Sequence, residues 1–270
     1  MTTVAIITGG AGGMGLATAK ILGRDHHLLL ADVNQERLDG AVAELQALGF
    51  TADAALCDIT DSASVDGLFT RAAQRGDIRC VVHTAGLSPQ MADAEAIMRV
   101  NALGTIHIAN AALGVASEGF ALVNVASMAG YLMPAALIPK RAYPLALSDT
   151  DRFLKKALFP TRLMPKAFYK KGLSYGISKN FVMWYSRRRA AEFGAKGARI
   201  VSVSPGSFDT AMGRLEEKSG SAEMLKDAAL KRFGRPEEIA NVLAFCASDK
   251  ASYLTGVDIL CDGGVVASRG

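Results

Sequence analysis

A glycine-rich segment near the start of the chain constrains its fold more than any other feature. An apolar run at residues 3–7 leads directly into Thr8-Gly9-Gly10-Ala11-Gly12-Gly13-Met14-Gly15, and an amphipathic stretch at residues 13–24 follows it. Glycines let the backbone turn tightly and approach a phosphate, and the first N–H groups of the next helix can bind that anion. An ordinary flexible turn is the alternative interpretation. Because the glycines lie between a strand and a helix, the segment favours a site for a nucleotide diphosphate.

Short apolar runs alternate with longer amphipathic stretches along the whole chain, a pattern that is typical of βαβ units and a parallel sheet. The predicted strands lie at residues 3–7, 27–31, 52–57, 79–84, 120–126, 199–203 and 257–261. The predicted helices lie at residues 13–24, 35–48, 62–75, 94–116, 173–195 and 237–247. We therefore expect one α/β domain over residues 1–270, with a doubly wound, Rossmann-type parallel sheet of seven strands and helices on both faces.

The composition argues against several classes of protein. The net charge is only +4, and no tract combines aromatic with basic residues, so nucleic-acid binding is not expected. The cysteines are scattered singly, which argues against a disulfide framework or a zinc site and indicates a reducing compartment. They are Cys57, Cys80, Cys246 and Cys261. We expect no metal site, and without a signal peptide or a bilayer-spanning stretch we expect a cytoplasmic protein with no stable membrane insertion.

One segment, residues 131–171, departs from the alternating pattern. It holds five of the eight prolines of the chain. Residues 140–171 contain nine Lys or Arg and two Asp, so this part carries a net charge of +7. Long connections inside compact domains are usually functional or disordered. We interpret the segment as a partly helical insertion in the domain rather than as a domain of its own.

Two acidic residues follow predicted strands on the nucleotide side of the sheet. Asp32 ends the second strand about twenty residues after the glycine turn, where an acid can hydrogen-bond ribose hydroxyls. A carboxylate there would repel a 2′-phosphate, and neither the glycine turn nor Val33-Asn34 offers a basic residue, so NAD is favoured over NADP. Asp58 follows the third strand and could contact the adenine edge. A helix-capping role is the alternative for both residues.

Tyr175 and Lys179 form the strongest candidate for chemistry. They are four residues apart, so they share one face of a predicted helix. A cation beside a phenol favours the phenolate, and such a phenol can exchange a proton with an alcohol or a carbonyl group. Ser127, after the fifth predicted strand, could hydrogen-bond the same oxygen. Taken alone, Lys179 could be a surface lysine and Ser127 a turn residue.

Together these pieces resemble the short-chain dehydrogenase/reductase family over essentially the whole chain. The glycine spacing of Thr8-Gly9-x-x-x-Gly13-x-Gly15 is that of the family's cofactor turn. The other matching segments, in chain order, are His83-Thr84-Ala85-Gly86, Val100-Asn101, Ala126-Ser127-Met128-Ala129-Gly130, Tyr175-x-x-x-Lys179, Pro205-Gly206 with Thr210, and Asp262-Gly263-Gly264. The first two positions of the second segment differ from the family's Asn-Asn-Ala-Gly, which puts the usual side-chain hydrogen bonds there in doubt.

The resemblance implies a role for each matching residue. Tyr175 would act as the acid or base, Lys179 would lower its pKa and hold the nicotinamide ribose, Ser127 would bind the substrate oxygen, and Asn101 would position a water. A merely structural role is the alternative for Asn101. The implied cofactor contacts are Gly9, Gly13, Met14, Gly15, Asp32, Asp58, Ala85, Gly86, Tyr175, Lys179, Pro205, Gly206 and Thr210.

The 47 residues between Ser127 and Tyr175 exceed the family's usual spacing. This insertion, with Pro144-Leu145-Ala146-Leu147 and Arg187-Arg188-Arg189-Ala190-Ala191, resembles the bacterial 3α-hydroxysteroid dehydrogenase/carbonyl reductases. We therefore expect a bulky, steroid-like alcohol or ketone as substrate and a lid formed by residues 131–171. An amphipathic flap for subunit contact and association with an anionic membrane surface are the alternatives for this segment.

Two alternative functions and an oligomeric state complete the predictions from the sequence. Reduction of 3-oxoacyl thioesters or xenobiotic carbonyls is the alternative activity, and a catalytically silent NAD-binding regulator is the alternative of another class. The resemblance also implies a homodimer or homotetramer through the helices at 94–116 and 173–195.

Overall fold

The computed structural model of this chain describes residues 2–216 and 222–269. Seven parallel strands form one sheet in the order β3-β2-β1-β4-β5-β6-β7. They are β1 (Thr3–Thr8), β2 (His27–Asp32), β3 (Ala52–Leu56), β4 (Asp77–His83), β5 (Ala121–Val125), β6 (Arg199–Pro205) and β7 (Asp258–Cys261). The winding direction reverses between β1 and β4, and a crevice at the carboxyl ends of the strands is expected at such a point. The predicted fold class is confirmed.

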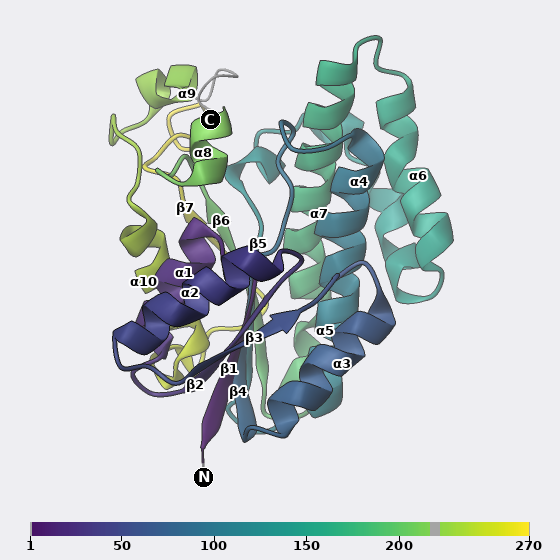
Figure 1. The fold of residues 1–270 in the computed structure, drawn as a ribbon. Helices are drawn as coiled ribbons and strands as arrows, with labels where there is room; N and C mark the ends of the chain where they lie inside the picture. Colours follow the sequence, from purple (N-terminus) through teal and green to yellow (C-terminus); the bar gives the residue numbers. More distant parts are fainter. Residues whose placement is uncertain (1, 217–221, 270) are drawn as a thin grey trace.

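Helices cover both faces of the sheet, as Figure 1 shows. Val4 and Ile6 of β1 pack into one core cluster and Ala5 and Ile7 into the other, because successive side chains of a strand point to opposite faces. The second cluster is closed by α1 (Gly13–Leu22), α2 (Gln35–Ala47) and α10 (Pro236–Ala247). The first is closed by α3 (Ser62–Ala73), α4 (Ala94–Met98), α5 (Gly104–Val115), α6 (Thr150–Arg162) and α7 (Ala167–Gly194).

Several helices differ from those expected. The predicted helix at 94–116 is divided into α4 and α5 by a π-helical turn, η1 (Arg99–Leu103). Helix α7 begins six residues earlier than expected and is 28 residues long. Two short helices, α8 (Ala211–Glu216) and α9 (Ala222–Asp227), follow β6 and were not predicted. These short segments lack the repeated apolar spacing by which a helix is recognised in a sequence.

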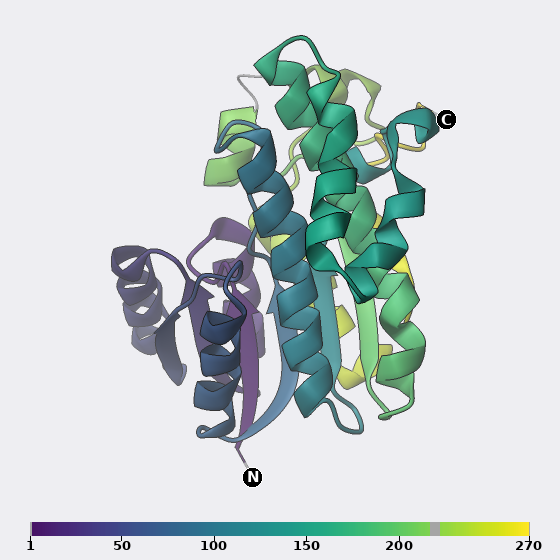
Figure 2. The same ribbon diagram turned by 90° about the vertical axis from the view of Figure 1, so that its right-hand side faces the viewer.

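The insertion packs mainly against α7. It follows the 3₁₀ turn η2 (Met128–Gly130) and contains the 3₁₀ turns η3 (Ala135–Leu137) and η4 (Lys140–Leu147), then α6, which lies alongside α7 (Figure 2). Tyr143 and Phe153 are fully buried, and their rings contact Phe181 of α7 at centroid distances of 5.3 and 4.4 Å. The central apolar residues of the insertion therefore belong to the core. A substrate lid therefore stays a prediction only for the two ends of the insertion.

The packing of the insertion on α7 also affects the predicted subunit contacts. Helix α7 lies between the sheet and α6, so its second apolar face contacts α6 and η4 of its own chain. The excess of apolar residues in the predicted helix at 173–195 thus has an explanation within one chain. Within the described ranges, none of the helices combines the length and the apolar character needed to cross a membrane.

Candidate active site

The carboxyl ends of β1, β4 and β5 bring the predicted motifs to one edge of the sheet. Thr8 pairs with His83, and His83 pairs with Asn124, so these three strands end at the same level. The glycine turn follows β1, Ala85-Gly86 follows β4, and Ser127 follows β5. Parallel strands that end together place the residues after them side by side, which is why motifs far apart in the sequence meet here.

The glycine turn forms a cradle that side chains would fill. Gly9 adopts φ +64°, and a Cβ there would lie 2.8 Å from the backbone nitrogen of Ala85. A Cβ at Gly15 would collide with the carbonyl oxygen of Gly9. Helix α1 begins after Gly12 without a side-chain cap, so its first N–H groups are available to an anion. The turn therefore fits a diphosphate.

Of the remaining predicted contacts, Thr210 lies against the glycine turn. A Cβ at Gly13 would lie 3.0 Å from Cγ2 of Thr210, so Thr210 stands over the turn. Gly206 donates its N–H to the carbonyl of Cys261 at 2.9 Å, which fixes the Pro205-Gly206 corner against the end of β7. Met14 lies half-buried on the first turn of α1.

Asp32 lies half-buried at the end of β2, and its Oδ1 accepts the N–H groups of Val33 at 2.9 Å and Asn34 at 3.3 Å. The cap of α2 is Asn34, which accepts the N–H of Arg37 at 2.9 Å, so the alternative of Asp32 as the helix cap is wrong. The Arg37 guanidinium donates to the carbonyl of Ala11 in the glycine turn at 3.2 Å. The sequence does not indicate this cation, because only the fold brings Arg37 of α2 next to the glycine turn.

Asp58 is engaged in a local turn. Its Oδ1 accepts both the N–H and the hydroxyl of Thr60, each at 2.8 Å. The cap of α3 is Asp61, which accepts the N–H of Ala63 at 3.0 Å. Asp58 therefore shapes the loop after β3 and keeps its second carboxylate oxygen for any further contact.

Lys179 and Asn101 meet around Gly86. The Lys179 side chain is only 6% exposed, and its Nζ donates to the carbonyl of Val125 at 2.9 Å. A Cβ at Gly86 would lie 3.1 Å from Oδ1 of Asn101 and 3.4 Å from Nζ of Lys179. Asn101 is held by Leu87, whose N–H donates to Oδ1 at 2.8 Å and whose carbonyl accepts from Nδ2 at 3.0 Å. Asn101 lies on the π-helical turn η1, so this turn supplies the second polar group beside Gly86.

Tyr175 and Ser127 are positioned by α7 and by η2. Nζ of Lys179 lies 5.8 Å from the centroid of the Tyr175 ring. Ser127 is nearly buried and caps η2 by accepting the N–H of Ala129 at 3.2 Å. The carbonyl of Gly130, at the end of η2, accepts from Nδ2 of Asn180 at 3.0 Å. This contact ties the segment after Ser127 to the residue next to Lys179.

His83 and Thr84, the two residues that differ from the family pattern, both hydrogen-bond to Thr8. Nδ1 of His83 lies 2.7 Å from the Thr8 hydroxyl, and the Thr84 hydroxyl donates to the carbonyl of Thr8 at 2.7 Å. Complete burial, with the charge of Lys179 as a smaller effect, lowers the pKa of His83 to about 3. His83 is therefore neutral at pH 7. The ends of β1 and β4 are linked by side chains despite the changed residues.

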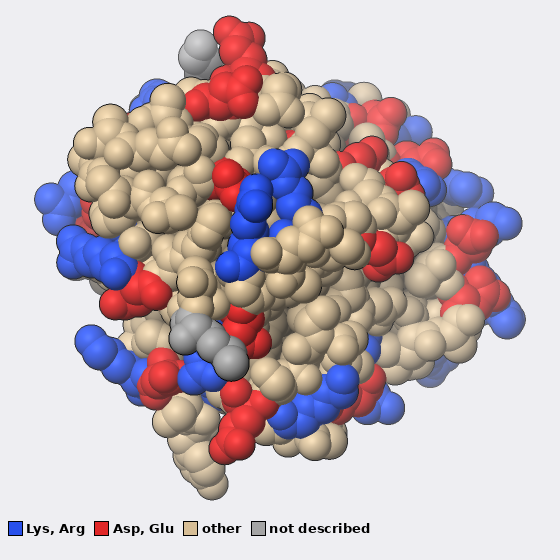
Figure 3. Space-filling model, turned by 60° about the horizontal axis from the view of Figure 1, so that its bottom comes forward, with Lys and Arg blue, Asp and Glu red and all other residues tan. Residues whose placement is uncertain are grey.

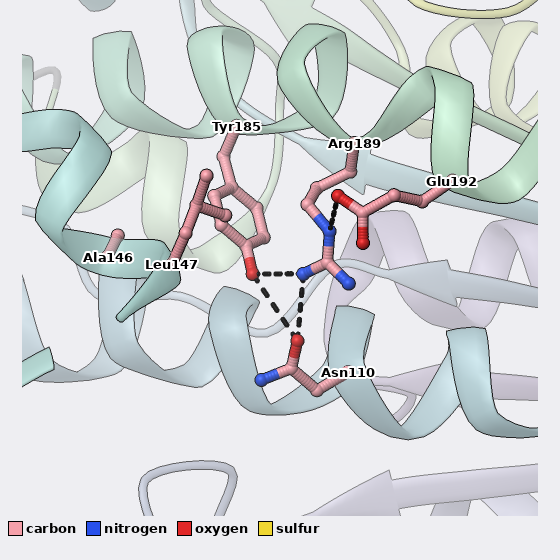
Figure 4. Close-up of a pocket in the computed structure, with 6 residues that line it drawn as sticks. All are labelled: Asn110, Ala146, Leu147, Tyr185, Arg189 and Glu192. Atoms are coloured by element: carbon pink, nitrogen blue, oxygen red, sulfur yellow. Dashed lines mark hydrogen bonds and ion pairs between the residues drawn. The ribbon is translucent and has the colours of Figure 1, made fainter. Parts of the chain in front are cut away.

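The pockets described on the surface lie away from this edge. One of about 220 Å³, shown in Figure 4, is formed by α5, η4 and α7. It is lined by Asn110, Ala146, Leu147, Tyr185, Arg189 and Glu192. Arg189 is 5% exposed, donates to Oδ1 of Asn110 at 2.8 Å and lies 2.9 Å from Oε1 of Glu192. Its charge is satisfied within the chain, so the candidate active site remains the one at the strand ends rather than this pocket.

Comparison with known proteins identifies the family of the chain. Residues 3–140 match the family described as short chain dehydrogenase, and residues 164–266 match the family described as enoyl-(acyl carrier protein) reductase. The unmatched stretch between them holds most of the insertion.

Two curated relatives cover nearly the whole chain. The chain is 31% identical to short-chain dehydrogenase/reductase bsc3 of Alternaria brassicicola, over 98% of this chain and 96% of that protein. It is 26% identical to 3-oxoacyl-[acyl-carrier-protein] reductase FabG of Thermotoga maritima, over 97% of each.

Solved structures share the fold. A short-chain dehydrogenase/reductase of Brucella melitensis, titled glucose/ribitol dehydrogenase, superposes with a TM-score of 0.76 at 26% identity, over 97% of this chain and 96% of that one. A variant of actinorhodin polyketide ketoreductase with NADPH has a TM-score of 0.77 at 19% identity, over 98% and 97%. The fold, the cofactor cradle and these matches lead to one conclusion: the chain belongs to the short-chain dehydrogenase/reductase family of oxidoreductases.

Proposed function

We propose that this protein interconverts a secondary alcohol and a ketone with NAD, using Ser127, Tyr175, Lys179 and Asn101. The observation that supports this most is the meeting of Lys179 and Asn101 around Gly86, next to the glycine cradle. Bound NAD would supply a nicotinamide that accepts a hydride from the alcohol or, when reduced, returns one to the ketone. The chain itself supplies orientation and the proton.

The proton is assigned to Tyr175. In the oxidation, the phenolate takes the proton of the alcohol, and in the reduction the phenol returns it to the substrate oxygen. Lys179 lies close enough to the Tyr175 ring to favour the phenolate by its charge. Ser127 would donate a hydrogen bond to the same oxygen as negative charge develops on it. Asn101 would hold a water that links Lys179 to solvent.

The choice of NAD rests on Asp32. Its carboxylate stands at the end of β2, and a 2′-phosphate beside it would be repelled. Arg37 is the observation in favour of NADP, because its guanidinium reaches the glycine turn. That guanidinium is already engaged with the Ala11 carbonyl, whereas Oδ1 of Asp32 is held by two backbone N–H groups that fix its orientation.

A bulky hydrophobic substrate, such as a steroid, fits the surroundings of Tyr175. Met133, from the start of the insertion, packs directly on Gly176, the residue after Tyr175. Phe168 lies exposed on α7 before the site. A 3-oxoacyl thioester or a xenobiotic carbonyl is the alternative, favoured by the similarity to the FabG protein. We also propose a cytoplasmic dimer or tetramer.

Replacement of Tyr175 by Phe tests the proposal, because it keeps the ring and removes the acid. NADH formation with a panel of secondary alcohols, steroids included, is expected to fall by a factor of about 100 to 10,000. Tyr169→Phe is the matched control, since Tyr169 is on the same helix and 52% exposed. Unchanged turnover in the Tyr175 variant would reject the assignment. Absence of turnover by the unmodified protein with every alcohol and ketone would favour a catalytically silent NAD-binding regulator.

A further inference from the structure

The end of the α6–α7 hairpin has an unusual surface. We call residues 155–171 the tip; they comprise the last two turns of α6, a short loop and the first turn of α7. Figures 1 and 2 both show the tip standing out beyond the end of the sheet. It contains no acidic residue and six basic ones, which are Lys155, Lys156, Arg162, Lys166, Lys170 and Lys171. Lys155, Lys156, Arg162 and Lys166 are exposed.

Large apolar side chains are exposed among these cations. Phe159 is 58% exposed and Leu163 is 67% exposed, and the two lie one turn apart at the end of α6. Phe168 and Tyr169, at the start of α7, are 59% and 52% exposed, and their rings contact each other at a centroid distance of 5.6 Å. Four large apolar side chains are thus exposed within residues 159–169, on the two helix ends that meet at the tip, and apolar surface exposed in this way marks interaction sites.

The charges of the tip also differ from those elsewhere on the molecule. Figure 3 shows the opposite end, where positive and negative side chains are interspersed. Basic residues there pair with carboxylates, as in Lys20–Glu44 and Arg75–Asp53. In the part of the chain that the structure describes, no carboxylate pairs with a cation of the tip. The nearest acids along the chain, Asp149 and Asp151, lie at the other end of α6, and Glu95 lies on the adjoining helix α4.

We propose that the tip binds peripherally to the surface of an anionic lipid bilayer. Aromatic and aliphatic side chains that enter the headgroup region, surrounded by Lys and Arg that meet anionic lipids, are the features by which amphipathic segments bind membranes. A contact between the tips of two copies of this chain is disfavoured, because two tips of the same charge repel each other. An acidic protein would satisfy the cations but would leave the four apolar side chains without a role.

Binding at the tip would also bring the active site close to the lipid. Phe168 and Tyr175 are seven residues apart on α7, so they lie on the same face about 10 Å apart along the helix axis. A ketone dissolved in the bilayer would then reach Tyr175 along this face. This consequence rests on the proposed function, whereas lipid binding itself does not.

Vesicle sedimentation tests the proposal with the full chain. One vesicle is phosphatidylcholine alone, and in the other about a third of the lipid is phosphatidylglycerol. The protein is expected to bind the anionic vesicles at least about tenfold more strongly, because each cation near an anionic surface contributes a factor of about five. Both Phe159→Ser/Leu163→Ser and Arg162→Glu/Lys166→Glu should lose this binding. Arg187→Glu/Arg188→Glu, which alters two exposed cations further along α7, should retain it.

Each other result would overturn the proposal. Sedimentation with neither vesicle, or equal binding by the tip variants and the unmodified protein, rejects lipid docking. Loss of binding in the charge variant alone indicates a purely electrostatic contact, as with an acidic protein. As a check that does not depend on loss of binding, Phe159→Trp places an indole at the tip, and its emission should shift to shorter wavelength only with anionic vesicles. An unshifted emission would contradict the proposal even if sedimentation occurs, while activity with the Tyr175 variant tests the chemistry separately.

Discussion

Phe153 offers a direct test of whether the insertion belongs to the core. Its side chain is fully buried, and its ring lies 4.4 Å from that of Phe181 and 6.4 Å from that of Tyr143, measured between centroids. Phe181 is on α7, two residues after Lys179. The substitution Phe153→Ala would therefore remove an aromatic side chain that joins α6 and η4 to the helix of the active site.

The expected loss can be worked out from this packing. Truncation of a buried Phe to Ala costs about 3–5 kcal/mol in the free energy of unfolding. Two aromatic contacts, each contributing about 0.5–1.5 kcal/mol beyond burial of area, keep Phe153 off the low end of that range, and we take the loss as about 4 kcal/mol. For a chain of this size, such a loss lowers the melting temperature by roughly 8–16 °C.

Thermal unfolding followed by circular dichroism measures this difference. The matched control is Phe159→Ala, because Phe159 lies on the same helix and is 58% exposed. Its free energy of unfolding should change by no more than about 0.5 kcal/mol. Equal melting temperatures for the two variants would show that the insertion folds as a detached lid, and the assignment of Tyr143 and Phe153 to the core would then be wrong.

Three further outcomes are expected. Asp32→Ser should raise the ratio of kcat/KM for NADP over NAD at least about fivefold, since a repulsion of roughly 1 kcal/mol or more is removed; an unchanged ratio in steady-state assays would contradict the role given to Asp32. Gly15→Ala should abolish the rise in melting temperature that NAD produces, because the new Cβ collides with the Gly9 carbonyl. For His83, the unfolded chain takes up a proton near pH 6.5 and the folded chain only near pH 3, so stability is lost as the pH falls through this window. In urea unfolding at pH 5, the unmodified protein should have lost about 2 kcal/mol of its free energy of unfolding through His83, and His83→Asn should not show this loss. Identical pH dependence of the two proteins would refute the buried neutral state.

The sequence was sufficient to predict the sheet, because its strands depend on local signals. Alternation of apolar and amphipathic stretches predicts each strand. The glycine turn is also a local feature, because Gly9 adopts a positive φ that favours glycine. The packing of the insertion depends on contacts between residues far apart, such as Tyr143 with Phe181, and no spacing in the sequence encodes them. Arg37 escaped notice for the same reason, since its contact with Ala11 joins two separate elements.

The contacts at the start of the insertion explain how the fold accommodates the long separation of Ser127 from Tyr175 in the sequence. The end of η2 lies directly against α7. A Cβ at Gly130 would lie 2.8 Å from the backbone nitrogen of Asn180, and the Gly130 carbonyl accepts a hydrogen bond from the Asn180 side chain. On the far side of this contact, the Tyr143 hydroxyl lies 3.1 Å from Oδ1 of the same Asn180. One residue beside Lys179 thus anchors both the segment after Ser127 and the insertion. The added residues can therefore pack on the outer face of α7 while the serine stays at the edge of the sheet, next to the helix that carries the tyrosine and the lysine.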